Sequence, residues 1–412
     1  MNTRWSDAFT THRNKLSVHV EASTRCNSRC VLCPRFVATS TITDPKLNLD
    51  EITIDEFKAW FPTELFSNMY YFNFCGNYGD PIACTDLAEI IEYLVANDAP
   101  KITIRTNGGV RNKKFWHKLG TLLQSKERHI VWSVDGMEDT NHLYRREVKW
   151  KNIQNNLMTF IAAGGYAQQE FLVFKHNEHQ IDEAKVHAKS LGIKRIDFKA
   201  AVGFANDLDK TYNPKPARDK NLNVTHVLEH AERYRSPDYT DVMFDGIPLT
   251  PSDYRRHWED ETVKLRHYLN TVNTDKELPL QVEKLDIYRS VEDNKIDCKV
   301  HINKGSENYR EVFLNPDGEV TPCCYMGQIT SDHSNQDLIT KEALKPYSEL
   351  NLNTNSLSNI ISILDRKVAD KWNKKHSEGR STTCSMTCGV RDNNQMSKIY
   401  RESEEAQKQN LL

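Results

Sequence analysis

Three cysteines near the start of the chain carry the strongest chemical signal in the sequence. Cys26, Cys30 and Cys33 form the pattern C-x3-C-x2-C. Thiolates are soft ligands that select iron–sulfur clusters, zinc or copper(I), and a [4Fe–4S] cluster usually takes four cysteines. A cluster held by this loop alone would keep one iron open to a small molecule. Structural zinc is the alternative, but zinc usually takes four N or S ligands, and no fourth ligand lies close by in the sequence.

A second group of cysteines lies in the last third of the chain. One precedes a predicted hairpin, two follow its turn, and two form a distal pair. Its members are Cys298, Cys323, Cys324, Cys384 and Cys388. A hairpin with cysteines beyond its turn and a distal pair suits a four-thiolate site, which could hold either an iron–sulfur cluster or zinc.

Alternating strands and helices are expected to position the first cysteine group. Runs with strand character occur at 16–20, 69–74, 101–106, 129–134, 170–175 and 195–200. Helical spacing occurs between them, at 53–60, 86–96, 153–163 and 181–190. This alternation predicts an α/β fold of right-handed parallel βαβ units. Six units with ligands at the strand carboxyl ends fit a partial TIM-type barrel, although the pattern alone does not exclude a doubly wound sheet.

Small and polar residues follow the carboxyl ends of these predicted strands. They are Gly79, Asp80 and Pro81 after the second strand, Thr106 at the third, Ser133 and Asp135 at the fourth, and Asn177 after the fifth. Glycine lets the backbone approach a ligand closely, and barrel ligands bind at this end of the strands. Hydroxyl and carboxylate groups suit the hydroxyls of a ribose. Cys75 and Cys84, which flank the second-strand loop, are expected to be core thiols.

The overall composition is that of a large protein without an obvious electrostatic partner. The chain has 412 residues and a formal net charge of −2, so global charge gives no argument for nucleic acid or a membrane surface. It contains no run of 18 apolar residues and no apolar N-terminal signal segment. Because the ten cysteines cluster as candidate ligands, we expect a reducing, cytoplasmic setting and not a disulfide framework.

The cysteine loop resembles the signature of radical S-adenosylmethionine (radical SAM) enzymes. In that family, the three cysteines hold a [4Fe–4S] cluster, and S-adenosylmethionine chelates the fourth iron. One electron then cleaves the cofactor to a 5′-deoxyadenosyl radical, which abstracts hydrogen from the substrate. The resemblance implies a (β/α)6 partial barrel, with Leu32 near the adenine. Gly79-Asp80-Pro81 resembles the family's Gly-Gly-Glu-Pro element, with Tyr78 in place of the first glycine and Asp in place of Glu.

Other strand ends extend this resemblance. Thr106, Ser133, Asp135 and Asn177 match positions at which the family contacts its cofactor, so the resemblance implies cofactor-binding roles for them. Arg145 or Arg146, which follow the fourth strand, could meet a carboxylate bidentately. No residue is assigned as catalytic.

The C-terminal cysteines resemble the SPASM or shorter twitch domain that follows many radical SAM barrels. Gly318-x4-Cys323 and the distal pair carry this likeness. The cysteine count implies one auxiliary [4Fe–4S] cluster, whose expected ligands are Cys298, Cys323, Cys384 and Cys388. Either Cys323 or Cys324 is spare, and zinc is the alternative occupant.

We therefore expect three regions. They are a radical SAM partial barrel at 1–203, a helical or irregular bridge or lid at 204–293, and a SPASM- or twitch-like domain of α+β type at 294–400. No residue of 204–293 is given a role. The resemblance implies a small-molecule or peptide substrate and an electron donor such as flavodoxin or ferredoxin. The alternative is a non-catalytic, metal-scaffolded binding or regulatory protein that retains the fold.

Overall fold

The structure is a computed structural model of the 412-residue chain. It describes residues 4–10, 15–201, 204–206, 211–231, 242–243, 295–296, 298, 301–304, 307–330, 344–375, 378, 380–381, 384–385 and 388–390. Most of the predicted bridge at 204–293 lies outside the described residues, as does the end of the third predicted region.

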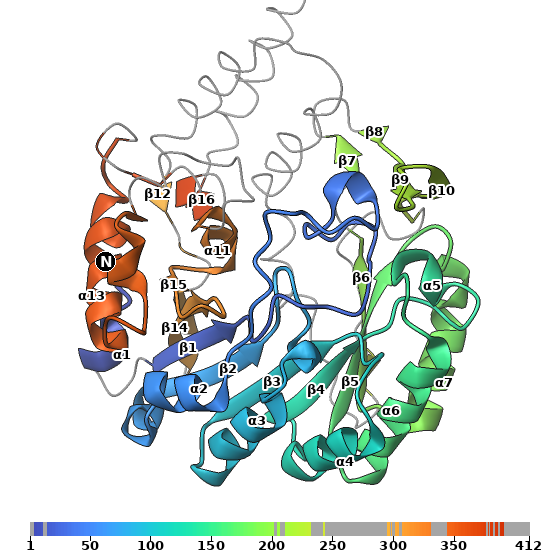
Figure 1. Ribbon diagram of the computed structural model, residues 1–412, viewed down its shortest axis with the longest axis horizontal. Coiled ribbons are helices and arrows are strands. Elements are labelled where there is room, and N and C mark those ends of the chain that lie inside the picture. The colour runs from blue at the N-terminus through green and yellow to red at the C-terminus, as the bar shows by residue number, and fades with distance from the viewer. Residues whose placement is uncertain are drawn as a thin grey trace, which may run out of the picture.

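A twisted, mostly parallel sheet forms the centre of the molecule (Figure 1). Six of its strands run parallel in sequence order: β1 (Lys15–Val20), β2 (Met69–Phe74), β3 (Lys101–Thr106), β4 (Arg128–Ser133), β5 (Ala167–Val173) and β6 (Arg195–Ala200). A doubly wound sheet would reverse direction at a switch point, whereas this order keeps every crossover on one side. The α/β class and the partial-barrel order of the predicted strands are confirmed.

Helices follow the outer face of this sheet, as Figure 1 shows. They are α2 (Ile54–Trp60), α3 (Leu87–Ala96), α4 (Lys113–Leu122), α6 (Trp150–Ala162) and α7 (Ile181–Leu191). The first begins with a capping box, in which the Thr53 hydroxyl accepts from the Glu56 amide and the Glu56 carboxylate accepts from Thr53. The last ends at Gly192, whose φ of 87° is left-handed, the conformation that a glycine cap supplies.

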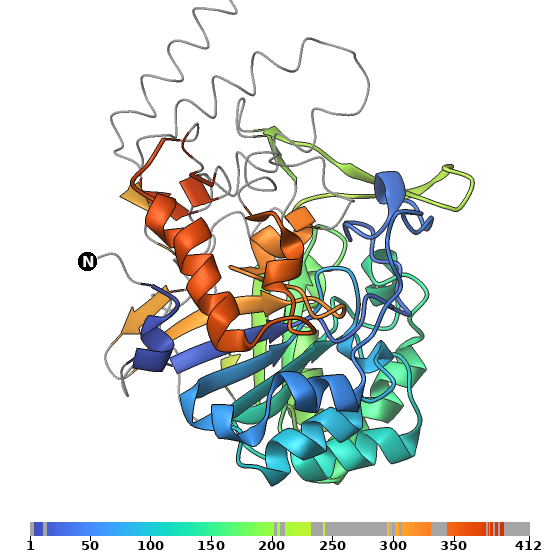
Figure 2. The same cartoon turned by 60° about the vertical axis from the view of Figure 1, so that its left-hand side comes forward.

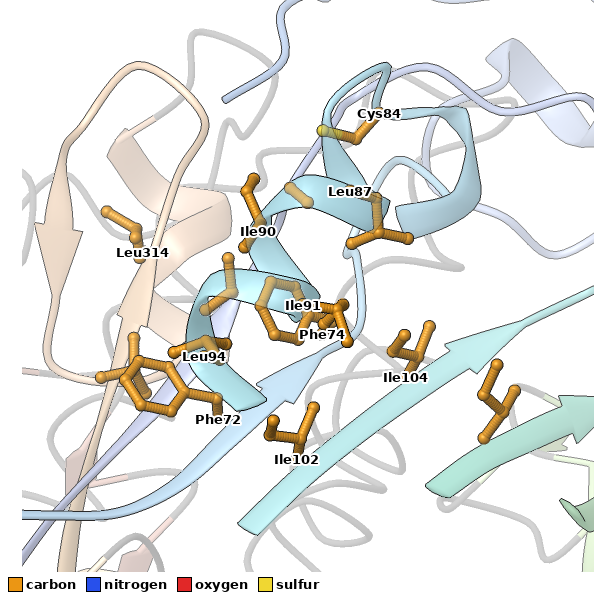
Figure 3. Close-up of a cluster of buried hydrophobic side chains, with 14 of the residues drawn as sticks. Phe72, Phe74, Cys84, Leu87, Ile90, Ile91, Leu94, Ile102, Ile104 and Leu314 are labelled. Atoms are coloured by element: carbon orange, nitrogen blue, oxygen red, sulfur yellow. The ribbon is translucent and has the colours of Figure 1, made fainter. Parts of the chain in front are cut away.

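The hydrophobic core lies between the sheet and this layer of helices. Figure 3 shows one part of it, in which Ile90, Ile91 and Leu94 of α3 pack over Phe72 and Ile102 on β2 and β3. All five side chains are fully buried. Cys84 is buried in the same cluster, so the prediction that it is a core thiol is confirmed. Because alternate strand residues point to opposite faces, the residues between these apolar ones face the inside of the barrel.

The C-terminal part of the chain extends the same sheet. Strand β14 (Glu307–Leu314) lies parallel to β1 and pairs with all of its residues, with Lys15 opposite Tyr309 and Val20 opposite Leu314. β13 (His301–Lys304) and β15 (Val320–Thr321) pair antiparallel with β14. Figure 2 shows these strands continuing the sheet beside β1, with α13 (Leu357–Lys367) alongside. The sequence predicted the end of this strand at 312–314 but not its partner.

Smaller elements complete the described structure. Short helices are α1 (Asp7–Thr10), α5 (Asn141–Tyr144) and α11 (Cys324–Thr330). Short strands are β7 (Ala205–Asn206), β8 (Thr211–Tyr212), β9 (Lys215–Arg218), β10 (Val224–Leu228), β11 (Val242–Met243), β12 (Lys295–Ile296) and β16 (Gly389–Val390). Short 3-10 helices lie at 37–39, 63–68, 81–83, 178–180, 347–350 and 369–371. Within the described residues, every helix is too short or too polar to cross a membrane.

Candidate functional site

The cysteine loop lies directly after β1, at the carboxyl ends of the parallel strands. Two arginine side chains hold the backbone of this loop through hydrogen bonds to its carbonyl groups and to those of neighbouring residues. The buried Arg35 guanidinium donates to the carbonyl of Thr24 at 2.5 Å and to that of Tyr78 at 2.7 Å. Arg146 donates to the carbonyl of Arg29 at 2.7 Å. The loop therefore has a fixed backbone before any ligand binds, in the place where barrel folds build their active sites.

Hydrogen-bond donors surround the cysteine sulfurs. The Ser28 amide donates to the Cys26 sulfur at 3.3 Å, and the Ser28 hydroxyl lies 3.1 Å from the Cys30 sulfur. The Arg145 guanidinium lies 3.6 Å from the sulfur of Cys30, and the Asn107 side-chain amide lies 3.9 Å from that of Cys26. Such donors stabilise thiolates, so the loop has the donor chemistry that a cluster requires.

Burial favours the neutral form of two of these thiols, Cys33 and Cys26. It raises the pKa of Cys33 to about 12, with the charge of Cys30 as a further cause, and it raises the pKa of Cys26 well above its ordinary value. A thiol with such a pKa stays neutral unless a metal ion stabilises its thiolate. Within the part of the chain that the structure describes, no three His, Cys, Asp or Glu side chains form a ready-made metal site. The thiols fit a cluster in type and placement, and ligation by them stays a prediction.

The loop after β2 packs tightly against the cysteine loop. A Cβ atom on Gly79 would lie 1.7 Å from the carbonyl oxygen of Ser23 and 2.9 Å from that of Arg25, so only glycine fits at this crossing. The amide of Asp80 donates to Arg25 at 2.9 Å. Glu21, at the end of β1, accepts from the amides of Tyr78 at 2.6 Å and Gly79 at 2.9 Å. The two loops are thus joined by the backbone contacts that the predicted cofactor element requires.

Asp80 connects the β2 loop to the end of β3. Its buried carboxylate accepts from the Asn107 amide at 2.8 Å and from the Asn107 side chain at 2.6 Å. It also accepts from the amide of Ile82 at 3.2 Å, which places Pro81 in the first turn of the short helix that follows. Thr106 is buried and accepts from the Gly108 amide at 3.0 Å. These bonds make Asp80 and Thr106 fix the shape of the strand ends.

Asp135, after β4, forms an ion pair inside the site. Its fully buried carboxylate meets the Arg145 guanidinium at 2.5 Å and accepts from the Leu172 amide at 2.6 Å. Burial raises the pKa of the Asp135 carboxyl, and the charge of Arg145 opposes that rise. Asn177 is also buried, and its side-chain amide donates to the Asp135 carbonyl at 2.8 Å. Ser133, at the end of β4, is only half-buried.

The structure brings most of the predicted strand-end residues into one connected network. Asn107 joins the ends of β2 and β3 to the cysteine loop, and Arg145 joins the end of β4 to it. Asn177 adds the end of β5. Leu32 lies beside Cys30 and Cys33, packed against the small apolar cluster that contains Tyr144 and Phe174. The cofactor-binding roles of these residues stay predictions.

The predicted auxiliary ligands also lie close to one another. Cys298 forms a side-chain hydrogen bond with Cys388, and this bond, burial and the charges of Cys388, Cys384 and Cys323 all raise its pKa. Burial is the main cause of the raised pKa of Cys323 and of Cys384, and Cys388 contributes to both shifts. Residues that are far apart in sequence therefore meet in the combination that the resemblance implied. Whether they bind iron–sulfur or zinc stays a prediction, as does the choice between Cys323 and Cys324.

Sequence reasoning missed several residues that shape the site. Glu21 and Arg35 hold the loops together, and neither belongs to a recognisable spacing. Asn107 follows Thr106 in the stretch that resembles the family's third-strand end, but nothing in the sequence assigned it a role. The position of Arg105 and Lys199 could have been predicted from the sequence. They alternate with apolar residues along their strands, and alternate residues of a strand point to opposite faces of the sheet.

Comparisons with known proteins give structural neighbours only. No protein-family profile matches the chain, and no curated protein matches it. It is similar to SuiB of Streptococcus suis bound to S-adenosylmethionine, at 13% identity and a TM-score of 0.44, over 76% of this chain and 61% of SuiB. The structure of SuiB bound to its precursor peptide SuiA is 13% identical to this chain, with a TM-score of 0.45, over 92% of this chain and 72% of SuiB. The structure of anSMEcpe with AdoMet and the Cp18Cys peptide is 13% identical to this chain, with a TM-score of 0.44, over 88% of this chain and 85% of anSMEcpe.

S-adenosylmethionine is bound in the first SuiB structure and in the anSMEcpe structure. The chain spans 61% of the length of the first SuiB structure and 66% of another. Identities near 13% with TM-scores below 0.5 carry no inference about the reaction of this chain, so its function is inferred from its own site.

Proposed function

We propose that this protein is a radical SAM enzyme, in which Cys26, Cys30 and Cys33 hold a [4Fe–4S] cluster. Such a cluster, when bound, supplies the electron that cleaves S-adenosylmethionine to a 5′-deoxyadenosyl radical. That radical would abstract hydrogen from a small-molecule or peptide substrate, in an oxidation or a peptide modification. An electron donor such as flavodoxin or ferredoxin, and a cytoplasmic setting, belong to the same proposal.

One observation carries the proposal. A C-x3-C-x2-C loop leaves the first strand of a sequentially ordered parallel sheet, at the end where the other strands present buried polar residues. A zinc knuckle would need a fourth ligand beside the three thiols. Ser28 and Asn107 donate to the sulfur of Cys26, and Arg145 donates to that of Cys30, so the nearby polar groups are hydrogen-bond donors.

The surrounding residues have separable roles in this proposal. The backbone at Gly79 and Asp80 would face the methionine end of the cofactor, because this loop crosses directly over the cysteine loop. Leu32 and Pro81 would contribute contacts at its apolar parts. Ser133 would offer a hydroxyl to the ribose. Thr106, Asp135 and Asn177 would contribute to the cofactor site from the ends of their strands, and their internal hydrogen bonds would hold those ends in place.

The C-terminal cysteines would hold an auxiliary cluster. Cys298, Cys323, Cys384 and Cys388 are near enough for mutual effects on their pKa values. A closed set of four thiolates suits either a [4Fe–4S] cluster or zinc. We propose the cluster, within a C-terminal region at 294–400 that follows a barrel at 1–203 and a bridge at 204–293.

Anaerobic reconstitution tests both parts of the proposal. With two [4Fe–4S] clusters, the chain should hold about eight irons and should form 5′-deoxyadenosine from S-adenosylmethionine when a strong reductant is added. Replacing Cys26, Cys30 and Cys33 together with alanine should remove about half of the iron and all of the 5′-deoxyadenosine. Cys84→Ala is the matched control, because this thiol lies in the core, and it should keep both.

The possible outcomes separate the alternatives. About four irons with one zinc would reject the auxiliary cluster and leave the barrel cluster in place. A full iron content without 5′-deoxyadenosine, with every reductant tried, would favour a non-catalytic protein that retains the fold. Iron that is unaffected by the triple replacement would reject the proposed site.

A further inference from the structure

The inner face of the barrel is charged. A TIM barrel interior is usually filled by branched apolar side chains. Here Arg105 on β3, Glu170 on β5 and Lys199 on β6 occupy the face opposite the helices, since their strand neighbours Ile104 and Phe171 belong to the helix-side core. Three charged side chains from three strands thus meet inside the barrel.

These three side chains form one ion cluster. Arg105 and Lys199 both contact the same carboxylate oxygen of Glu170, Lys199 at 2.7 Å. Burial alone would raise the pKa of Glu170, but the charges of Arg105 and Lys199 outweigh it and hold that pKa near 2. Glu170 is therefore ionised at neutral pH, and one carboxylate is shared between two cations.

Solvent reaches this cluster. The side chains of Arg105, Glu170 and Lys199 keep 30%, 17% and 21% of their exposure. An ion triad kept only for stability gains little, because desolvation offsets the attraction between its charges. Groups that are both charged and accessible inside a fold are better explained by a ligand that meets them.

The cluster lies next to the proposed cofactor site. Glu170 is in register with Ser133 on β4, and neighbouring parallel strands lie about 4.8 Å apart. Cys75, at the end of β2, lies near enough for the charges of Arg105 and Glu170 to affect its pKa. A group bound to Arg105 and Lys199 would therefore lie just inside the strand ends, within the barrel that the cysteine loop covers.

The remaining charges near the cluster leave it cationic. Glu311 on β14 faces Arg105, but burial raises the pKa of Glu311 to about 7. His19 is neutral at pH 7, since burial lowers its pKa to about 4. On the same face, Arg195 and Asp197 of β6 pair with each other at 2.5 Å and add no net charge. Arg105 and Lys199 therefore carry one positive charge more than Glu170, the fully ionised carboxylate of the cluster, can balance. An excess of one positive charge matches a monoanion, whereas a phosphate monoester carries close to two negative charges.

We propose that Arg105 and Lys199 bind a carboxylate group of the substrate inside the barrel, and that Glu170 holds the two cations in place. The guanidinium can meet a carboxylate bidentately, and the ammonium adds a mobile point charge. This inference rests on the proposed function, because it places the substrate beside the site of radical formation. It narrows the substrate to carboxylic acids, including acidic peptide side chains and α-carboxylates.

Binding of ¹³C-labelled acetate tests the site without requiring turnover. Its line broadening is measured on the reconstituted full chain, with acetamide as the neutral isostere and inorganic phosphate as competitor. The single variants are Arg105→Gln, Lys199→Gln and Glu170→Gln. The double variant Arg105→Gln/Glu170→Gln removes both partners of one ion pair, so that neither residue keeps an unpaired charge. Lys118→Gln is the matched control, because Lys118 pairs with Glu89 and Glu92 on the outer helices.

Acetate should bind wild type and Lys118→Gln equally, and Lys199→Gln or Arg105→Gln should weaken binding at least about tenfold, a difference of about 1.4 kcal/mol. Glu170→Gln should tighten binding, because the glutamine oxygen can still accept from both cations while the negative charge that competes with acetate is removed. Equal effects of acetate and acetamide, tighter binding of phosphate, or no change in the Lys199→Gln variant would overturn the proposal. If S-adenosylmethionine binding falls together with acetate binding, the cations serve the cofactor and the inference fails. Absence of 5′-deoxyadenosine with acetate binding intact would instead reject the proposed function.

Discussion

Arg145 connects the end of β4 to the cysteine loop. It pairs with the fully buried carboxylate of Asp135 at 2.5 Å and reaches the sulfur of Cys30 at 3.6 Å. The sequence offered Arg145 and Arg146 as equal candidates for a carboxylate. Only the fold shows which of the two meets a carboxylate. The Arg146 guanidinium instead donates to the backbone carbonyls of Arg29 and Arg218.

Replacing Arg145 should expose the cost of a buried charge. In Arg145→Met, Asp135 would stay buried without its cation, and the free energy of unfolding should fall by about 3–5 kcal/mol. The double variant Arg145→Met/Asp135→Asn should recover part of that loss, since no unpaired carboxylate remains. Urea unfolding of full chains in the same metal state measures both. Equal stability of the single and double variants would show that the ion pair does not hold the strand ends together.

Residue roles were harder to predict than residue positions. Asp80, Thr106, Asp135 and Asn177 do lie at strand carboxyl ends, where the pattern placed them. The sequence could not show that their polar atoms are taken up by amides such as those of Asn107, Gly108 and Leu172. The partners of Asp80 and Asp135 come from neighbouring strands, and pairing across strands is not encoded by local spacing.

Elements with strong periodicity were predicted well, and weakly patterned ones were not. Strands at 69–74, 101–106 and 195–200 have the bounds that the sequence indicated. Helix α4 was missed, because its ten residues include Gly120 and three lysines that dilute the apolar spacing. Strand β5 begins three residues before the predicted 170, since Gln168 and Gln169 conceal its alternation.

The crossing of the β1 and β2 loops predicts a separation of effects between two glycines. Gly79→Ala would place a Cβ 1.7 Å from the Ser23 carbonyl oxygen, so the β2 loop must move away from the cysteine loop. We expect S-adenosylmethionine affinity to fall at least about tenfold, or by about 1.4 kcal/mol, while the helices and sheet unfold near the wild-type midpoint. Titration of the cofactor into the reconstituted chain gives the first quantity, and circular dichroism gives the second.

Gly192→Ala is the control for this prediction. Its left-handed φ of 87° makes alanine unfavourable by about 1 kcal/mol, but the new Cβ meets only Ile161, at 3.5 Å. Stability should fall and cofactor affinity should stay unchanged. If both glycine variants bind the cofactor as wild type does, the β2 loop is not part of the cofactor site.

At the scale of the whole molecule, the seam between β1 and β14 should respond to pH. Glu311 on β14 lies opposite Ser17 and 4.0 Å from His19, and Arg105 and Tyr71 also act on it. Burial raises the pKa of Glu311 to about 7, so the folded chain keeps this proton after the unfolded chain has lost it. Stability from this group is full below about pH 4.5 and falls by about 1.4 kcal/mol per pH unit as pH rises toward 7.

Glu311→Gln should remove that slope. The variant should gain stability relative to wild type between pH 5 and pH 7.5, as measured by urea midpoints in matched buffers. His19 does not contribute to the difference between the two proteins in this pH range. Burial lowers its pKa to about 4, so it stays neutral in both. Parallel pH profiles for the two chains would mean that Glu311 is solvated at the seam.

The partner of β1 could not be read from sequence because it lies so far along the chain. Lys15 is opposite Tyr309, and no local pattern records a contact over that separation.

This pairing also has a consequence for biosynthesis. At about 5–20 residues per second, β14 leaves the ribosome roughly 15–60 seconds after β1. During that time, one edge of the nascent barrel has unpaired amides and carbonyls, which can recruit another strand. We expect a chaperone that covers this edge during synthesis to increase the yield of folded protein, and slower translation to decrease it.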